Sequence, residues 1–269
     1  MQKTLKLKKF CLSCKSNQEV VLESNIIKDK IKCNVYRCVK CTFVYLDKKF
    51  IKNQKKNFYI NNYFHSYDKK FYKNKNNIYK KIFKIIKPHI KNKNVLEIGP
   101  GGGYMYHYLQ KIVKNYEALE IGDKLRKELE KKYNIKVFNS FNKIKKKYDV
   151  IMLISVLEHV KNPKIFLQKL KKYLSDKGKV IIEVPSVNDP LVSSYNLNYY
   201  KSKYFRKVHL HYFNHKTLEN IVIDSGLKVQ KILTKQTYSF TNHMNWIYSK
   251  KGQKNSNEAT NINLPVNLD

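Results

Sequence analysis

Three glycines with a carboxylate beside them form the segment best suited to hold a ligand. The run from Val95 to Gly103 reads as a short apolar strand and a turn with glycine at positions 99, 101 and 103. Glycine allows a sharp bend and a close backbone approach, and a helix that begins near Tyr104 would direct its free N–H groups into the same space. The segment therefore predicts a strand, a ligand-binding turn and a helix.

The pattern around this turn argues against a dinucleotide. A turn that binds a pyrophosphate has the spacing G-x-G-x-x-G, which here would need a glycine in place of Tyr104. Glu97, two residues before Gly99, would also repel phosphate. A carboxylate suits a ligand with a cationic amino-acid end, and S-adenosylmethionine (SAM) is the common one.

Two further strands and a second acid follow the turn. Glu120 closes the apolar run Tyr116 to Ile121, about twenty residues on, where doubly wound folds keep an acid for ribose hydroxyls. The run Tyr148 to Ile154 predicts another strand, and Asn162-Pro163 opens the next helix. Two acids would therefore flank one crevice.

The order and spacing of four motifs now resemble those of the class I SAM-dependent methyltransferases, over about residues 75–248. The motifs are LEIGPGGG, then Glu120, then YDVIMLISVLEHVKNP, then LSDKGKVIIEVPS. The resemblance implies an α/β fold with a doubly wound, seven-stranded, mostly parallel sheet. We expect its last strands at 227–233 and, antiparallel, at 238–248. Asn139 stands where the family often has an aspartate for the adenine. The implied SAM contacts are Glu97, Gly99, Pro100, Gly101, Gly103, Glu120, Ile121, Asn139 and Ser155.

Four of the five cysteines form two C-x-x-C pairs separated by 23 residues, namely Cys11 with Cys14 and Cys38 with Cys41. Each pair can offer two thiolates to one tetrahedral zinc, whose binding would fold a module too small to bury its own core. Four thiolates leave no open position, so we predict a structural zinc ribbon. We expect Cys33 to be buried, with a role as substitute ligand as the alternative.

The chain then divides into four parts. Tyr59, Tyr63 and Tyr67 lie in a connector, where they either pack the ribbon against the main domain or touch SAM or the acceptor. The predicted parts are a zinc ribbon (1–48), an aromatic and basic connector (49–77), a methyltransferase domain (78–248) and a disordered polar tail (249–269).

Three histidines are candidates for removing a proton from a hydroxyl acceptor, because histidine titrates near neutral pH. His159 belongs to a Glu-His pair that recurs across methyltransferases with unrelated acceptors, which implies a structural or cofactor-shaping role. His209 and His211, in the run His209 to Phe213, are therefore the favoured bases. All cysteines lie in the first 41 residues, so a cysteine nucleophile is not expected.

The net charge of +35 would ordinarily suggest a nucleic-acid partner. Only three basic residues are arginine, however, and abundant lysine, asparagine, isoleucine and tyrosine are typical of an AT-rich genome. Scarce arginine forks argue against a base-reading surface. The chain shows no apolar run long enough to span a membrane and no apolar segment after its first lysines, so we expect a cytoplasmic protein.

A zinc ribbon fused to this core resembles bacterial enzymes that modify surface polysaccharides and sugar nucleotides. The resemblance implies O-methylation of a small anionic metabolite, such as a nucleotide-linked sugar or a phosphate or phosphoramidate group of a capsule precursor. Two alternatives stay open. One is a ribosomal RNA base methyltransferase, which the basic surface would fit, and the other is a SAM-binding scaffold without turnover. The sequence assigns neither the acceptor atom nor an oligomeric state.

Overall fold

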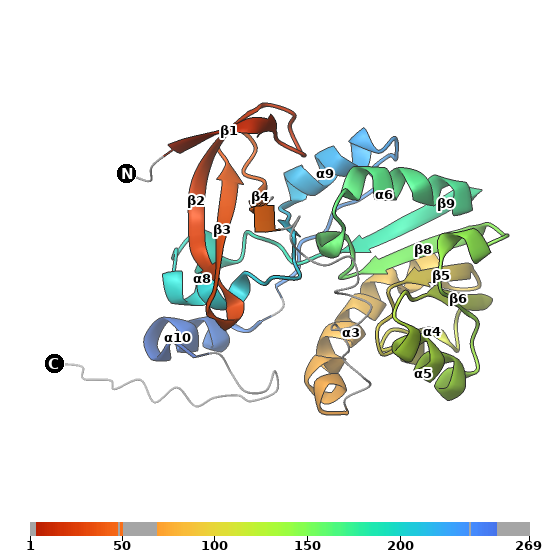
Figure 1. Cartoon of the computed structure of the whole chain (residues 1–269). Helices are drawn as coiled ribbons and strands as arrows, with labels where there is room; N and C mark the ends of the chain where they lie inside the picture. Colours follow the sequence, from red (N-terminus) through yellow and green to blue (C-terminus); the bar gives the residue numbers. More distant parts are fainter. Residues whose placement is uncertain (1–3, 48, 51–68, 237, 252–269) are drawn as a thin grey trace.

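The computed structural model describes residues 4–47, 49–50, 69–236 and 238–251. The three connector tyrosines and the part of the predicted tail after residue 251 lie outside these residues. The described chain forms two sheets that lie beside one another (Figure 1). Within the described ranges, no helix has both the length and the apolar character of a membrane span.

The sheet that carries the glycine turn is parallel and has five strands in the order β7-β6-β5-β8-β9. The chain leaves the central strand β5 toward β6 and β7 and then crosses to the other side at β8, so the strand order reverses beside β5. In doubly wound folds ligands bind at this switch point, at the carboxyl ends of the strands. The strands are β5 (Asn94–Ile98), β6 (Asn115–Leu119), β7 (Val137–Phe138), β8 (Tyr148–Ile154) and β9 (Leu174–Glu183).

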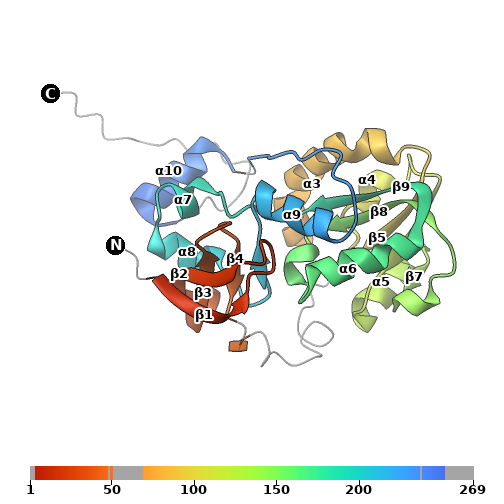
Figure 2. The same cartoon turned by 90° about the horizontal axis from the view of Figure 1, so that it is seen from above.

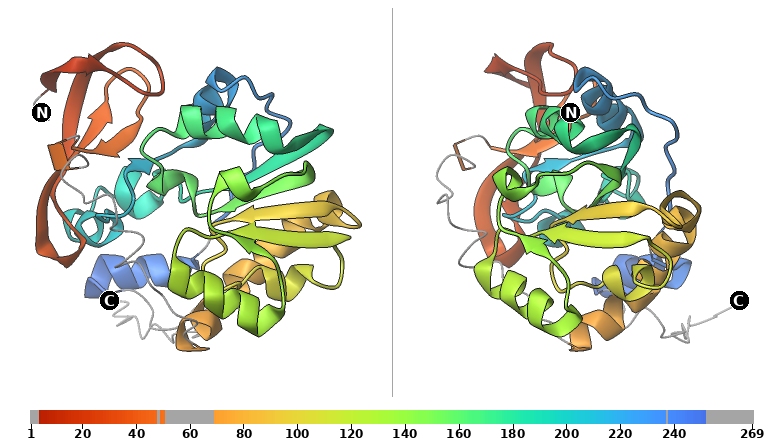
Figure 3. Two further views of the ribbon diagram at one scale, coloured as in Figure 1. Left: turned by 45° about the vertical axis from the view of Figure 1, so that its right-hand side comes forward. Right: turned by 90° about the vertical axis from the view of Figure 1, so that its right-hand side faces the viewer.

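Helices cover both faces of this sheet (Figure 3). Leu96 and Ile98 face α6 (Pro163–Leu170) and α9 (His215–Asp224), whereas Val95 faces the opposite layer. Side chains alternate along a strand, so a strand with apolar residues at successive positions is covered on both sides. The opposite layer consists of α3 (Lys69–Ile90), α4 (Tyr106–Leu109) and α5 (Asp123–Tyr133).

The N-terminal sheet is antiparallel, and its last strand comes from the far end of the chain. Its order is β1-β2-β3-β4-β10, and in β10 (His211–Tyr212) His211 pairs with Tyr45 and Tyr212 with Val44. Phe213 then forms a parallel bridge with Ser186, just beyond β9. The two sheets are thus linked through residues 211–213. The remaining strands are β1 (Thr4–Phe10), β2 (Asn17–Ile27), β3 (Ile31–Cys38) and β4 (Val44–Leu46).

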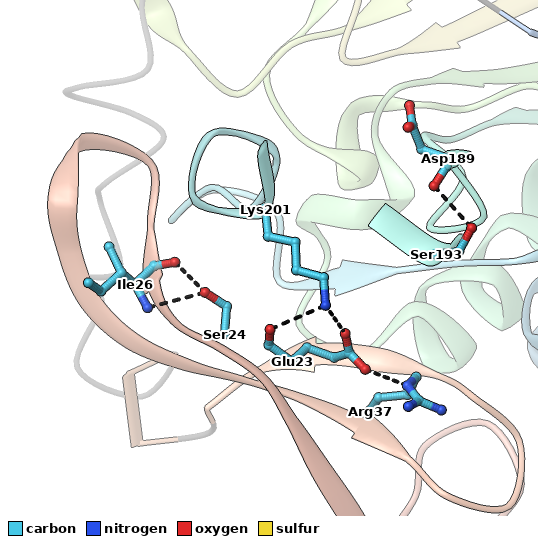
Figure 4. A network of polar contacts seen from close by, with 7 residues as sticks. All are labelled: Glu23, Ser24, Ile26, Arg37, Asp189, Ser193 and Lys201. Atoms are coloured by element: carbon cyan, nitrogen blue, oxygen red, sulfur yellow. Dashed lines mark hydrogen bonds and ion pairs between the residues drawn. The ribbon is translucent and has the colours of Figure 1, made fainter. Parts of the chain in front are cut away.

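Three helices from the second half of the chain cover one face of the N-terminal sheet (Figure 2). They are α7 (Pro190–Ser193), α8 (Asn198–Tyr204) and α10 (Phe240–Ser249). In α8, buried Lys201 places its Nζ 2.7 Å from Glu23 Oε2, and Arg37 Nε lies 2.5 Å from Glu23 Oε1 (Figure 4). Burial alone would raise the pKa of Glu23, but hydrogen bonds from Arg37 and Lys201 hold it below its ordinary value.

The prediction of seven strands is wrong for the described chain, whose parallel sheet has five. Residues 227–233, which are predicted to be a strand, form no ladder with a neighbour in the described ranges. The predicted strand 238–248 is instead the helix α10, because Ser239 caps its first turn through Asn242 N–H. Buried Asn242 and His243 and packed Trp246 and Ile247 then recur at helical spacing.

Two local predictions also change. The helix expected from near Tyr104 begins at Tyr106, after a run of turn residues. Within the motif LSDKGKVIIEVPS, Asp176-Lys177-Gly178 is predicted to be a turn that ends the preceding helix, but it lies inside β9, where the pairing with β8 shifts register. A Cβ at Gly178 would approach Ser175 O to 2.9 Å, so glycine allows the chain to fold tightly against the strand there.

Candidate active site

The glycine turn lies at the carboxyl end of β5, beside the switch point of the sheet. Gly99, Gly101 and Gly103 have φ angles of 66°, 56° and 74°, which side chains rarely tolerate. Gly99 N–H donates to Leu119 O at 2.8 Å and Gly103 N–H to Pro100 O at 3.0 Å. These bonds tie the turn to the end of β6 and close it upon itself.

The glycines differ in what surrounds them. A Cβ at Gly103 would meet Leu129 and Tyr133 of α5 at 2.7 and 2.6 Å, so this glycine permits the helix to pack. A Cβ at Gly101 would meet no protein atom within 4 Å. Tyr104, at the position of the third glycine of a dinucleotide turn, is buried and stacks on Tyr79 with ring centroids 5.4 Å apart. The open side of the turn is therefore at Gly101.

Glu120 lies next to this open side. It is buried, and its Oε1 accepts from Gly122 N–H at 2.9 Å. Burial raises its pKa, while backbone N–H groups of Gly122, Gly101 and Ile121 oppose that rise. A carboxylate held beside Gly101 in this way is placed to accept hydrogen bonds from ribose hydroxyls.

Glu97 is oriented differently. It is buried on the α3 and α4 side of the sheet, and its Oε2 accepts from Tyr116 Oη at 2.5 Å. Burial raises the pKa of Glu97 to about 7, and the bond from Tyr116 counteracts part of that rise. Contact between Glu97 and a ligand's ammonium group stays a prediction.

The other predicted cofactor residues lie at strand ends on the same edge of the sheet. Pro100 is buried within the turn, and Ile121 is 50% exposed beside Glu120. Asn139 is exposed immediately after β7. Ser155 follows β8 with a φ of 54° and donates from Oγ to Glu183 Oε2 at 2.8 Å. Their contacts with the cofactor stay predictions, but the fold gathers them around one crevice.

A second cluster lies just past β8. Glu158, His159 and His209 have ligand atoms that all lie within 4.8 Å of one another. Leu210 N–H donates to Glu158 O at 2.8 Å, and His159 Nδ1 donates to Val208 O at 2.7 Å. Since these bonds bracket His209, they fix it beside the Glu-His pair, and its ring meets that of His159 edge-on at 4.9 Å.

Burial governs the charges of this cluster. It lowers the pKa of His159 to about 4, so this ring is neutral at pH 7. Burial also raises the pKa of Glu158 well above its ordinary value, and the nearby charge of Glu183 adds to the rise. Both carboxylate oxygens of Glu158 lack a hydrogen-bond partner among the described residues.

His211, the other favoured base, lies elsewhere. It is buried in β10 with its ring stacked on Phe43 at 5.6 Å, and its Nε2 is 3.4 Å from Lys161 O. The structure thus brings His159 and His209 together and places His211 in the core between the sheets. Glu158 is not among the residues predicted from the sequence to act on the acceptor, although its position next to His159, after β8, is a usable signal.

The four cysteines of the two C-x-x-C pairs also converge. Cys11 Sγ and Cys41 Sγ are 3.6 Å apart and Cys14 Sγ and Cys38 Sγ 3.8 Å, too long for disulfide bonds. Thiolates about 2.3 Å from a tetrahedral zinc are separated by roughly 3.8 Å, so the set fits zinc. The fifth, Cys33, is buried in the other core of the N-terminal sheet, as expected.

The cysteine turns rest on α9. Lys15 Nζ lies 2.8 Å from Asp224 Oδ2, and Asn214 Nδ2 donates to Thr42 Oγ1 at 2.7 Å. Ile221 of α9 shares a core with Cys11 and Cys38. The cysteine cluster therefore supports the helix that follows the His209 to Phe213 segment.

A separate hollow of about 350 Å³ lies at the other end of the sheet. Asn115, Glu117, Lys136 and Lys146 line it, near the amino end of β6. The glycine turn does not contribute to it, so this hollow is distinct from the crevice described above.

The strand order, the glycine turn and the acid after β6 define a Rossmann-like α/β domain with a ligand crevice at the switch point of its sheet. The methyltransferase domain family matches residues 67–232, and the chain belongs to this family. An uncharacterized protein of Methanocaldococcus jannaschii is 30% identical over 151 residues, which are 54% of this chain and 69% of that protein.

Two solved structures are similar at lower identity. The plantazolicin methyltransferase is 15% identical with a TM-score of 0.44, over 58% of this chain and 62% of that one. A sugar N-methyltransferase from Streptoalloteichus is 12% identical with a TM-score of 0.36, over 44% and 51%. The chain thus spans less than two thirds of the length of either protein.

Proposed function

We propose that this methyltransferase transfers the methyl group of SAM to an oxygen of a small anionic metabolite of surface-polysaccharide biosynthesis. The acceptor class is a nucleotide-linked sugar or a phosphate or phosphoramidate group of a capsule precursor. One observation carries the proposal of an oxygen acceptor. A cofactor crevice at Gly101 and Glu120 lies at the same edge of one sheet as a partly buried cluster of acid and base groups, Glu158, His159 and His209.

The residues around the turn fit SAM. The space that a Cβ at Gly101 would enter holds no protein atom within 4 Å, and Glu120 borders it. When bound, SAM supplies an electrophilic methyl group on a sulfonium, which is already a good leaving group. The protein then has to bind and orient the cofactor and the acceptor, because alignment provides most of the rate enhancement in such a displacement.

A hydroxyl acceptor must also lose its proton to the protein or to water during the reaction, whereas an amine acceptor can lose its extra proton to solvent before it attacks. Neutral His159 and the neighbouring His209 support proton removal at their cluster, while buried His211 is less suited to it. Basic side chains next to these histidines support an anionic acceptor. Lys161 and Arg206 are exposed, and Lys207 is half-buried.

We also propose that Cys11, Cys14, Cys38 and Cys41 hold a structural zinc. The spacing of their sulfur atoms supports this. Zinc would fix the cysteine turns against α9 and take no part in the reaction, since four thiolates fill its coordination shell. Elemental analysis should find one zinc bound by these cysteines per chain.

The test is methyl transfer from labelled SAM to two fractions of the host cell, small metabolites including nucleotide-sugars, and total RNA. We expect label on an oxygen of an anionic small metabolite. Glu120→Ala should abolish labelling through lost SAM binding, whereas Asp123→Ala, at an exposed acid three residues on, should not. Label in RNA, or on a nitrogen atom, would overturn the proposed acceptor.

A further inference from the structure

The cluster of Glu158, His159 and His209 has the features of a metal-binding site that is separate from the cysteine site. Glu158 is 1% exposed, and neither of its carboxylate oxygens has a hydrogen-bond partner in the described chain. A buried carboxylate without partners costs several kcal/mol, unless a proton or a cation compensates it. The carboxylate therefore needs a positive partner that the described side chains do not supply.

The neighbouring histidine does not hydrogen-bond to this carboxylate. The Nδ1–H of His159 donates to Val208 O at 2.7 Å, which directs Nε2 away from that carbonyl. Nε2 lies 3.8 Å from Glu158 Oε1, beyond hydrogen-bond distance. An imidazole nitrogen and a carboxylate oxygen, both common metal ligands, therefore face one another across this gap.

The distance favours a metal over a shared proton. A shared proton would draw the two atoms to about 2.7–3.0 Å, the length of a hydrogen bond. Two ligand atoms that each lie about 2.1 Å from one tetrahedral metal are separated by roughly 3.4 Å. The 3.8 Å gap between Nε2 and Oε1 is longer than a hydrogen bond and lies closer to the tetrahedral separation.

His209 completes the set from another part of the chain. Its ligand nitrogen lies within 4.8 Å of those of the other two residues, and backbone bonds at Val208 and Leu210 hold it there. The bond from His159 Nδ1 to a carbonyl is also the usual way in which a protein orients a metal-binding imidazole. Glu183 adds a second negative charge that acts on Glu158, whereas Arg206 adds a positive one that acts on His159.

We propose that Glu158, His159 and His209 bind one divalent cation at the acceptor end of the crevice. Two imidazoles and one carboxylate suit Mn²⁺, Fe²⁺ or Zn²⁺ and leave coordination positions open. If the proposed oxygen acceptor is correct, on which this role rests, the cation lowers the pKa of the acceptor hydroxyl. Because the histidine ring nitrogens then bind the cation, their part in proton removal is indirect and the proton passes to water. The oxygen electron pair forms the new C–O bond, and the C–S bond breaks with its electrons on sulfur.

The test counts Mn²⁺ bound to the full-length protein, purified with its cysteine site loaded with zinc, by the loss of the free Mn²⁺ signal in electron paramagnetic resonance. Mn²⁺ prefers oxygen and nitrogen ligands, so the thiolate site does not compete. We expect one bound Mn²⁺ per chain and at least about tenfold weaker binding in Glu158→Gln and in His209→Ala. Glu120→Gln, at another buried acid on the same edge, should bind Mn²⁺ like the wild type.

A second count uses zinc. After dialysis against excess zinc, elemental analysis should find one more zinc per chain in the wild type than in Glu158→Gln. Circular dichroism tests whether each variant is folded. If Glu158→Gln is unfolded, the metal count is made on His209→Ala, whose substitution is at a half-buried site. The proposal is overturned if the wild type takes up neither metal beyond the cysteine site, or if folded His209→Ala binds both as tightly as the wild type.

This result is independent of the acceptor. Binding of Mn²⁺ needs neither SAM nor a substrate, so label in RNA would refute the proposed acceptor and leave the metal site in place. Conversely, labelled small metabolites from a protein that binds no extra metal would refute the metal site alone.

Discussion

The two sheets of this protein are built in different ways. The parallel sheet consists of strands that follow one another within residues 94–183, and short sequence motifs mark its turn and its strand ends. The N-terminal sheet combines strands within residues 4–46 with β10, which lies more than 160 residues further along the chain. The first sheet can form from nearby segments, whereas the second needs long-range contacts.

The long-range contacts of the N-terminal sheet are polar as well as apolar. Glu23 pairs with Lys201, and Lys15 with Asp224. The cysteine turns and Thr42 contact α9 directly. The N-terminal sheet therefore depends on the rest of the chain, and β10 makes the segment that carries His209 depend on the N-terminal sheet. Substitutions that destabilise one sheet at a time should show which sheet depends on the other.

The largest effect is expected from Cys14→Ser. Loss of one thiolate should release the proposed zinc and unfold the cysteine turns, with a fall in Tm of more than about 10 °C. SAM binding at the parallel sheet should persist, while methyl transfer should be lost with the support of His209. Differential scanning calorimetry, elemental analysis and isothermal titration with SAM measure these three properties.

The matched control is Cys33→Ala, which removes the buried cysteine outside the cluster. This variant should keep its zinc and lose only about 1–2 kcal/mol of stability. Equal zinc loss in both variants would contradict the assignment of the four ligands. Loss of SAM binding in Cys14→Ser would show that the two sheets form a single cooperative unit.

Lys201→Ala should have the next largest effect. It leaves Glu23, nearly buried, with Arg37 as its remaining ionic partner, and breaking a buried pair on one side costs about 3–5 kcal/mol. Urea unfolding at pH 7 measures the loss. Lys203→Ala, at an exposed site in the same helix, should stay within about 0.5 kcal/mol of the wild type.

A double variant tests the ionic origin of that loss. Glu23→Gln with Lys201→Met removes both charges and should recover most of the stability, because replacing a buried pair with uncharged groups is often neutral. If the double variant is as unstable as Lys201→Ala, packing of α8 and not charge would be the cause.

The same asymmetry explains how far the sequence could predict the fold. The turn at Gly99 to Gly103 and the strand Tyr148–Ile154 are local patterns, and the structure confirms both. The pairing of β10 with β4 could not be predicted, since two residues, His211 and Tyr212, form that strand only because Val44 and Tyr45 offer an unpaired edge.

Other errors have related causes. A strand was predicted at 227–233, but a strand also needs a neighbouring strand to pair with, and the described chain provides none there. For the site, the sequence pointed to His159 and His209 separately. It could not show that backbone bonds at Val208 and Leu210 bring them to Glu158. Contacts between residues that lie far apart in the chain depend on tertiary structure.

The titration of Glu97 makes the stability of the parallel sheet depend on pH. Its folded pKa of about 7 is above the ordinary value of 4.5, so the folded state holds the proton more tightly. Stability should therefore fall as pH rises from about 4.5 to 7, by up to about 3 kcal/mol. Glu97→Gln keeps an acceptor for Tyr116 and should lose this part of the slope.

The measurement is urea unfolding of the cofactor-free protein at pH 5 and pH 8. The difference in unfolding free energy between Glu97→Gln and the wild type should favour the variant more at pH 8 than at pH 5. Glu19→Gln, at an exposed acid in the N-terminal sheet, should follow the wild type at both pH values. Parallel pH profiles for Glu97→Gln and the wild type would show that Glu97 is not the titrating group.

The smallest change in stability is expected from Gly101→Ala, which separates the fold of the parallel sheet from its function. At a φ of 56° alanine costs about 1–2 kcal/mol, and no protein atom lies within 4 Å of the new methyl group. The methyl would instead occupy the space assigned to SAM, so the affinity for SAM should fall at least about tenfold by isothermal titration.

The matched control is Gly226→Ala, at a similar φ of 76°, where the new methyl group would meet only the flexible end of Lys171. It should lose similar stability and bind SAM normally. Equal SAM affinity in the two variants would mean that the cofactor does not approach the turn at Gly101, and that the crevice lies elsewhere along this edge of the sheet.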